Sequence, residues 1–279
     1  HFPMIDNYGS LTLDGCDVRY SDYKGIYSGG IFLSIANSTI ADSGAEGIQV
    51  NGHSLTLVNS QVADNGSTGV ELLAGDTFIA PVLLNNTFTG NGYYAVSIGA
   101  SRAPTSGITV DLSTLNGNVG SGNTIDTIHF GGNFTGTNVL TPQVGLPYVF
   151  GLYVDINTDS SLTLMPGTVV KFLLNYQNEL DVYGALEAQG TADSPVVFTS
   201  YKDDSYGGDT NGDGDASTPA PNDWRRIYIA SGAVVTLEHT IVRYGGYDHP
   251  YGGTHFPMID NYGSLTLDGC DVRYSDYKG

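Results

Sequence analysis

The sequence is poor in basic residues. It holds ten Lys and Arg against 29 Asp and Glu, which gives a formal net charge of −19. Nucleic acids and anionic membrane surfaces are bound by clustered cations, so this deficit argues against both as partners. The sequence also has no apolar run near the roughly 18 residues of a membrane span, so we expect no membrane insertion. The acidity fits a well-solvated surface or the binding of divalent cations.

Cysteine is almost absent. The two cysteines, Cys16 and Cys270, stand at the same position in two copies of one segment. One cysteine per repeat excludes a disulfide framework within the repeat. The sequence begins with His and shows no signal peptide. We therefore expect it to be a window from a longer protein, or a mature or engineered product.

A long exact repeat is present instead. The 25 residues HFPMIDNYGSLTLDGCDVRYSDYKG occur at 1–25 (the first copy) and again at 255–279 (the second copy), with no mismatch. This is what a window slightly longer than one 254-residue period of a tandem array looks like. An engineered chain with a duplicated end is the alternative.

A shorter repeat predicts the fold. Equivalent apolar positions recur every 22 residues, in the sets Leu11, Leu33, Leu55; Val18, Ile40, Val62; and Ile26, Ile48, Val70. Each copy of this repeat holds three short apolar stretches separated by Asn, Asp, Gly and Ser. Two of the stretches alternate with period two, as half-buried strands do. Three short strands per 22 residues predict a β-solenoid with stacked parallel strands rather than hairpins or leucine-rich repeats.

The segment SSLTLMPGTVVKF…LDVYGALEAQGTADSPVVFTSYKDD, which begins at Ser160, carries a family resemblance. With the Asn37 and Asn59 turn patterns, it resembles the right-handed parallel β-helix repeats of large secreted bacterial and archaeal surface proteins, within the pectate-lyase-like β-helix superfamily. The resemblance implies an all-β, right-handed parallel β-helix, with about ten coils per 254-residue period. It says little about function, because this scaffold carries lyases, hydrolases, adhesins and inert stalks.

The resemblance also suggests repeat boundaries. Units of the family start near LPYVFGLYVDI, so residues 145–279 would be the opening coils of one unit and 1–144 the later coils of the preceding unit. Together they would form one continuous solenoid. At roughly 4.8 Å per coil, ten coils give a rise of about 50 Å per period. Asn37 and Asn59 are expected to stack in an asparagine ladder.

An acidic loop is the strongest chemical signal. Within YKDDSYGGDTNGDGDASTPAPNDW, oxygen-bearing side chains alternate around a Gly turn, namely Asp209, Asn211, Asp213 and Asp215. This spacing suits Ca²⁺, which takes six to eight oxygen ligands, and it resembles the calcium loops of EF-hand and dockerin-type modules.

The loop departs from those modules at its twelfth position. Ala220 stands there instead of a bidentate Glu, so Asp203, Asp204 and Asp223 are further candidate ligands. The expected cofactor is a structural Ca²⁺ of roughly 10⁻⁴–10⁻³ M affinity. A solvated acidic loop without an ion is the alternative.

Catalytic signals are weaker. Glu179, Asp181 and Glu187 could form a carboxylate pair for glycoside hydrolysis, but strand alternation predicts that these acids face solvent. Arg225 and Arg226 could serve a Ca²⁺-dependent lyase, although adjacent strand residues point to opposite faces, so only one could meet a substrate. We therefore expect no enzymatic activity and no catalytic residue.

The function expected from the sequence is structural. The chain would be one period of a secreted, tandemly repeated β-helical protein of the cell surface, such as an extracellular filament, stalk or adhesin. Its partners would be further copies of itself, joined end to end, and cell-surface carbohydrate. The alternatives are a Ca²⁺-dependent polysaccharide lyase or hydrolase, and a carbohydrate-binding surface without catalysis.

Overall fold

The structure is a computed structural model that describes residues 1–73, 78–99, 109–151, 154–248 and 255–276. In these ranges it contains strands and no helix, which confirms the expected all-β class. The described part of the chain accordingly holds no helix that could cross a membrane. The chain forms two compact units: the first comprises residues 1–130 and 143–146, and the second comprises 131–142 and 147–279.

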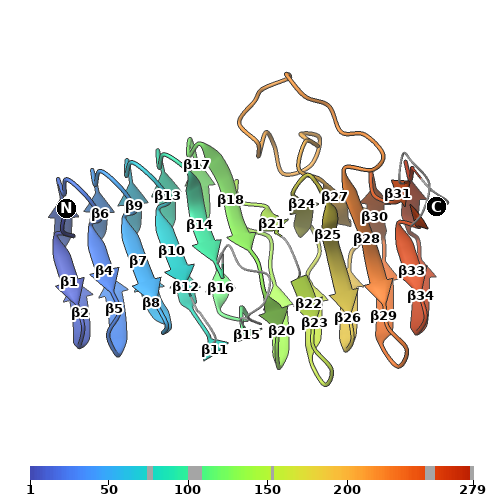
Figure 1. The fold of residues 1–279 in the computed structure, drawn as a ribbon, viewed down its shortest axis with the longest axis horizontal. Helices are drawn as coiled ribbons and strands as arrows, with labels where there is room; N and C mark the ends of the chain where they lie inside the picture. The colour runs from blue at the N-terminus through green and yellow to red at the C-terminus, as the bar shows by residue number, and fades with distance from the viewer. Residues whose placement is uncertain (74–77, 100–108, 152–153, 249–254, 277–279) are drawn as a thin grey trace. The chain divides into compact units, whose positions relative to one another are not determined.

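The first unit consists of stacked parallel strands (Figure 1). Its longest sheet has the order β1 (Ile5–Asn7), β4 (Ile26–Ser28), β7 (Ile48–Asn51), β10 (Val70–Leu73), β14 (Tyr94–Ile98), β18 (Ile125–Phe130). A second sheet contains β2 (Ser10–Asp14), β5 (Phe32–Ala36), β8 (Leu55–Val58), β12 (Val82–Leu84), β16 (Leu115–Asn116). A third contains β3 (Asp17–Arg19), β6 (Thr39–Ala41), β9 (Gln61–Ala63), β13 (Thr87–Thr89), β17 (Val119–Ser121). The short strands β11 (Phe78–Ile79) and β15 (Thr109–Val110) also pair in parallel.

The second unit repeats this plan. Its three parallel sheets are β19 (Asn133–Phe134), β22 (Val154–Ile156), β25 (Asn175–Val182), β28 (Trp224–Ile229), β33 (Ile259–Asn261); β20 (Thr137–Leu140), β23 (Ser161–Leu164), β26 (Ala185–Gln189), β29 (Val234–Glu238), β34 (Ser264–Asp268); and β21 (Tyr148–Phe150), β24 (Val169–Phe172), β27 (Val196–Ser200), β30 (Thr240–Arg243), β35 (Asp271–Arg273). The strands β31 (Tyr247–Asp248) and β32 (His255–Phe256) form an antiparallel pair.

The 22-residue repeat becomes one coil of three strands. Ile26 is in register with Ile48, and Ile48 with Val70, so equivalent residues stack directly on one another. All three side chains are fully buried. Alternation along each strand turns every second side chain inward, and the stacked coils enclose a continuous apolar core in each unit. The expected parallel solenoid is therefore confirmed.

Asn37 and Asn59 do bond from coil to coil as expected, although not to each other: Asn37 Nδ2 donates to Asp14 Oδ1 at 2.8 Å, and Asn59 Oδ1 accepts from Asn85 Nδ2 at 3.4 Å. Asn37 and Asn59 are exposed and both have φ of 50°, a left-handed turn conformation that Asn tolerates. Two longer rows of buried side chains at neighbouring positions also bond from coil to coil inside the first unit: Ser38, Ser60, Asn86, Asn118, Gln143; and Ser43, Asn65, Asn91, Asn123. These rows satisfy backbone groups at the corners, where the sheet ladders are interrupted.

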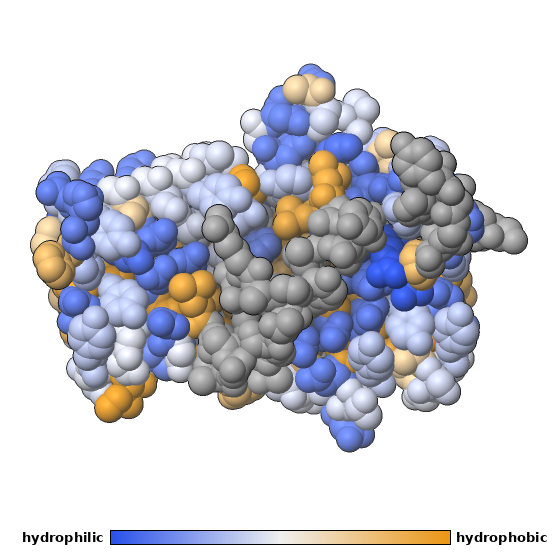
Figure 2. Space-filling model, viewed as in Figure 1, coloured by the Kyte–Doolittle hydropathy of each residue, from blue (hydrophilic) through white to orange (hydrophobic). Residues whose placement is uncertain are grey.

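One long loop interrupts the second unit. Residues 201–223 contain no strand and connect β27 to β28, as the sequence predicted. Figure 1 shows the loop rising away from the strands, and Figure 2 shows that its protruding surface is mostly hydrophilic. The loop therefore lies outside the apolar core while both of its ends remain attached to core strands.

Candidate metal centre

The start of the acidic loop is fixed by a buried ion pair. Asp203 is 2% exposed, and its carboxylate accepts hydrogen bonds from Thr199, Ser205 and Arg243. Burial alone would raise the pKa of Asp203, but the bonds from Ser205, Thr199 and Arg243 together hold it below its ordinary value. Asp203, one of the further candidate ligands, thus anchors the loop to β30.

The end of the loop is fixed in a similar way. Asp223 is 9% exposed; it accepts hydrogen bonds from Ser200 Oγ at 2.6 Å and from the amide of Ala220 at 3.0 Å, and pairs with Lys202 Nζ at 2.9 Å. Its oxygens are therefore engaged by the protein. Ser200 ends β27 and Asp223 directly precedes β28, so this carboxylate ties the two ends of the loop together.

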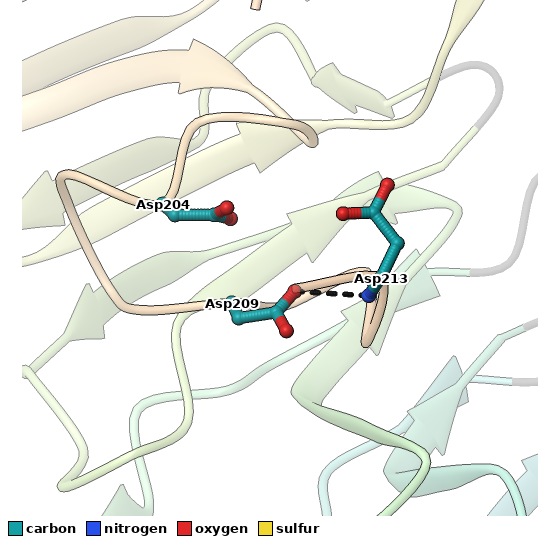
Figure 3. Close-up of side chains that lie close together, drawn as sticks. All are labelled: Asp204, Asp209 and Asp213. Carbon is teal, nitrogen blue, oxygen red and sulfur yellow. Dashed lines mark hydrogen bonds between the residues drawn. The ribbon is translucent and has the colours of Figure 1, made fainter. Parts of the chain in front are cut away.

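Three other carboxylates of the loop converge. Oxygens of Asp204, Asp209 and Asp213 lie within 4.8 Å of one another (Figure 3), and this is the one such group among the described residues. Asp209 accepts hydrogen bonds from the amides of Asp213 at 3.2 Å and Gly214 at 2.8 Å. Gly214 has φ of 64°, the left-handed conformation that the sharp turn requires.

Several oxygens around this group have no partner. Asp204 Oδ1, Asn211 Oδ1 and Asp213 Oδ1 are buried atoms without a hydrogen bond. Asn211 is held beside Asp213, because its Nδ2 donates to Asp213 Oδ2 at 2.9 Å and to Ser217 Oγ at 3.0 Å. A buried oxygen without a donor is costly, and a cation is one way to satisfy several at once.

A buried lysine lies close to the same carboxylates. Lys171 is fully buried on β24, and its Nζ donates to the carbonyl of Gly208 at 2.7 Å. Burial lowers its pKa to about 8, while Asp204, Asp203 and Asp209 act in the opposite direction. Conversely, burial and then Asp209 raise the pKa of Asp204, against the effect of Lys171. One lysine thus only partly compensates the acidic group.

The donor set fits a hard divalent cation. Asp204, Asp209, Asn211 and Asp213 provide only oxygen, the donor atom that Ca²⁺ prefers. Asp215 is exposed and lies outside the group of three carboxylates. Four side chains would leave further positions of a six- to eight-coordinate ion to backbone or water oxygens, which favours modest affinity.

A second polar cluster lies on β25 and β28. Glu179 is buried and pairs with both arginines, with Oε1 at 2.7 Å from Arg225 Nη1 and Oε2 at 2.8 Å from Arg226 Nε. Arg226 also pairs with Asp260 of β33. The prediction that Glu179 faces solvent is wrong. Both guanidinium groups converge on this one carboxylate, although Arg225 and Arg226 are adjacent residues of one strand.

Two further acids flank this cluster. Asp155 on β22 is in register with Asp181 on β25, and Asp181 is half-buried with an unpartnered Oδ1. Burial, reinforced by Glu179, raises the pKa of Asp155 to about 6 and that of Asp181 to about 7. Asp181 therefore does not face solvent freely as expected, whereas Glu187 is exposed as predicted.

The comparison with protein families agrees with this architecture. Residues 4–139 match the family model of the right handed beta helix region. Together with the parallel sheets of both units, the match shows an all-β, right-handed parallel β-helix fold. No curated protein matches the sequence. The fold class and the family resemblance are thus confirmed.

Two residues important to the site had no signal in the sequence pattern. Lys171 is 37 residues before its partner Gly208, and Arg243 is 40 residues after its partner Asp203. In a solenoid such distances place residues on neighbouring coils. A register assignment across the irregular loop would have been needed to find either contact.

Proposed function

We propose that the protein is a structural β-helix, one period of a secreted, tandemly repeated filament, stalk or adhesin of the cell surface. Its repeats stack end to end in one continuous solenoid, and Ca²⁺ pins the acidic loop. The proposal rests mainly on one observation: the same 25-residue coil packs against a following coil in one unit and against a preceding coil in the other.

The first copy packs on the coil that follows it. Three of its apolar residues are in register with apolar residues of that coil: Ile5 with Ile26, Leu11 with Leu33, and Val18 with Ile40. The second copy packs on the coil that precedes it, with Ile259 on Ile227, Leu265 on Val235, and Val272 on Val242. The same residues therefore carry the core on either side.

A copy that lay between a preceding coil and a following coil would continue all three columns of stacked apolar side chains without interruption. Six strands stack in the longest sheet of the first unit and five in each main sheet of the second, counted over the described ranges. With the last coil repeating the first, this fits ten coils per period. A polar cap would end such columns; neither copy supplies one, because both carry the same alternating sequence.

The acidic surface and the calcium loop support an extracellular setting. A site with few charged ligands and modest affinity is filled only where Ca²⁺ is millimolar, as outside cells. A filament or stalk would need no catalytic centre. Exposed tyrosines such as Tyr8, Tyr183 and Tyr262 offer surface for carbohydrate contact, which supports an adhesin as one form of the proposal.

A chain of two periods, residues 1–254 followed by 1–279, tests the proposal. By electron microscopy it should form a single rod that is longer than the 279-residue chain by about 50 Å, since ten coils each add roughly 4.8 Å. The matched control carries Ile→Asp at the internal equivalent of Ile5, which should break the rod at the junction. Two particles on a flexible link in the unmodified chain would contradict the proposal.

Catalysis is the alternative, and Asp155 and Asp181 are the observation that favours it, since their pKa values of about 6 and about 7 suit proton transfer. We infer against it because Arg225 and Arg226 are both committed to Glu179. Incubation with pectin, alginate or other uronic-acid polymers should release neither unsaturated products nor reducing ends. Turnover that disappears in Asp181→Asn or Arg226→Ala would establish the enzymatic alternative.

A further inference from the structure

Lys171 is an unusual residue for a buried strand position. It lies on β24, in register with Val149 of β21 and Thr199 of β27, and all three side chains are fully buried. The acidic loop lies directly over the lysine, because a Cβ on Gly207 would stand 3.4 Å from Lys171 Cε. A fully buried ammonium is costly unless charges and hydrogen bonds compensate it. The loop therefore has to supply this compensation.

The acidic loop supplies both a hydrogen bond and opposite charge. Lys171 Nζ donates to the carbonyl of Gly208 at 2.7 Å, and Gly208 directly precedes Asp209. Burial lowers the pKa of Lys171 to about 8, and the charges of Asp204, Asp203 and Asp209 oppose this shift. The ammonium group therefore lies among the carboxylates of the loop.

The charges around Lys171 do not cancel. Asp203 already has its own ion-pair partner, which leaves Asp204, Asp209 and Asp213, whose oxygens converge (Figure 3). We call these three residues the acidic group. Three carboxylates carry three negative charges when ionised, and Lys171 supplies one positive charge, so two negative charges remain. One divalent cation neutralises this remainder, whereas the acidic group without Lys171 would match a trivalent cation.

Lys171 does not replace a metal ion completely. Its ammonium bonds to Gly208, while Asp204 Oδ1, Asn211 Oδ1 and Asp213 Oδ1 are buried without any hydrogen bond. A cation with several coordination positions satisfies such oxygens together. The lysine and a metal ion can thus occupy the site side by side, and the ion then experiences the positive charge of the lysine.

We propose that Lys171 is a built-in counter-ion of the acidic group, which makes the site prefer divalent over trivalent cations and lowers its affinity for Ca²⁺. This inference rests on the calcium site of the proposed function and goes further by naming the residue that sets its selectivity. The physical cause is repulsion between the ammonium and the incoming ion, which is strong where burial limits screening by water. The same ammonium keeps the loop attached to β24 before the ion binds.

Two substitutions that remove the charge test the selectivity. Lys171→Gln keeps a hydrogen-bond donor for Gly208, and Lys171→Met keeps the length of the side chain without a donor. Each should tighten Ca²⁺ binding by about tenfold at pH 7, where the unmodified lysine is mostly protonated. Because the repulsion grows with the charge of the ion, each should tighten Tb³⁺ binding by about thirtyfold. Isothermal titration calorimetry of the full chain with CaCl₂ and with TbCl₃ measures both changes.

The matched control is Lys24→Gln. Lys24 is a half-buried lysine of the first unit and pairs with Glu46 at 3.7 Å, so its loss changes the net charge by the same amount without touching the loop. Both affinities should stay within about twofold of those of the unmodified chain, because solvent screens distant charges.

Protease resistance gives a second readout that does not depend on the affinities. Without metal ions, both Lys171 variants should be cleaved faster within residues 201–223 than the unmodified chain, because the acidic group has lost its counter-ion. Saturating Ca²⁺ should restore the resistance, so the protection gained from Ca²⁺ should be larger in the variants. Hydrogen exchange of β24 and β27 distinguishes this local loosening from unfolding of the coils.

The outcomes separate this inference from the proposed function. Equal Ca²⁺ affinities in the unmodified chain and both variants, or equal gains for Ca²⁺ and Tb³⁺, would overturn the role of Lys171 and leave the calcium site intact. Ca²⁺ uptake by the variants alone would support the counter-ion but remove Ca²⁺ from the proposed function. Uptake by none of the chains would overturn both.

Discussion

The two copies have the same 25 residues and share three strands, yet their side chains have different surroundings. The strands β1, β2 and β3 recur with the same bounds as β33, β34 and β35. The left-handed turns recur as well, with φ of 62° at Gly15 and 63° at Gly269. Met4 is 51% exposed, however, whereas Met258 is fully buried. Local sequence therefore determines the path of the coil, and the neighbouring coil determines which of its side chains are buried.

The charged residues of the copies show the same division. Arg19 pairs with Asp17 of its own strand and with Asp42 of the following coil. Its equivalent, Arg273, pairs with Asp271 of its own strand. The contact within the strand depends on the local sequence alone, whereas the contact between coils depends on the neighbouring coil.

The largest effect is expected for two arginines that occupy paired positions on neighbouring coils. Arg243 is in register with Arg273, but only Arg243 is buried, in its pair with Asp203. Arg243→Ala leaves the Asp203 carboxylate buried without its cation, which should cost about 3–5 kcal/mol in the free energy of unfolding. Arg273→Ala removes an exposed pair and should cost less than about 1 kcal/mol. Urea denaturation measures both.

Limited proteolysis adds a local control. The Arg243→Ala chain should be cleaved faster within residues 201–223, since Asp203 anchors the start of this loop, and Arg273→Ala should be cleaved as the unmodified chain is. Equal losses of stability in the two variants would show that the buried pair does not anchor the loop.

The next effect compares the methionines. Met258→Ala leaves a cavity between Trp224 and Gly245 and should lower stability by about 2–4 kcal/mol, up to the limit set by local opening of the last coil. Met4→Ala trims an exposed side chain and should change stability by less than about 0.5 kcal/mol. Hydrogen exchange, compared between residues 255–276 and residues 26–51, measures how much of the loss of stability is confined to the last coil. Similar losses at both positions would mean that the copies are equally buried in solution.

The features that the sequence predicts follow the same division between local coil and stacked neighbours. The 22-residue spacing gave the parallel coils and the inward columns, because residues such as Leu33 and Leu55 must repeat at the period at which strands stack. The loop bounds followed from the flanking strands. Within the loop, the convergence of Asp209 and Asp213 followed from their spacing around the glycine turn.

The interactions that the sequence did not reveal all run between coils or across irregular backbone. Alternation predicted that Glu179 faces solvent, but the register shifts between Asn175 and Glu179, and Arg225 and Arg226 of the next coil cover the carboxylate. Asp203 has the same side chain as Asp204 but meets Arg243 from a later coil. When two aspartates are adjacent, the sequence alone cannot tell which one is a candidate metal ligand and which one anchors the loop.

A smaller effect concerns Asp181, which β28 separates from the second copy. Burial raises the pKa of Asp181 to about 7, so the folded protein holds a proton that the unfolded chain releases near pH 4. Stability should therefore fall as pH rises between these values. Asp181→Asn removes that loss, so the variant should exceed the unmodified chain by about 1–2 kcal/mol at pH 8 and show no such gain at pH 4.

The matched control for this prediction is Glu187→Gln. Glu187 lies on β26 and is exposed, so its neutralisation should leave the pH dependence of stability unchanged. Thermal unfolding between pH 4 and pH 8 measures both variants. A gain in the Asp181→Asn variant that does not depend on pH would indicate better packing rather than relief of a buried charge.

The smallest effect is expected from Ca²⁺, which should stabilise the loop at residues 201–223 and leave both copies unchanged. For a dissociation constant of roughly 10⁻⁴–10⁻³ M, 1 mM Ca²⁺ stabilises the folded chain by about 0.4–1.4 kcal/mol. Chelation should therefore lower the melting temperature slightly and expose residues 201–223 to protease, without changing protection in either copy.

Asp213→Asn should abolish the calcium effect, because Asp213 Oδ1 is a buried oxygen of the acidic group without a partner. Asp215→Asn should retain most of it, since Asp215 lies outside that group. Calorimetry with no uptake at millimolar Ca²⁺, or equal calcium responses in the two variants, would leave the loop a protein-anchored acidic surface. Asp203 and Asp223 would then account for its order by themselves.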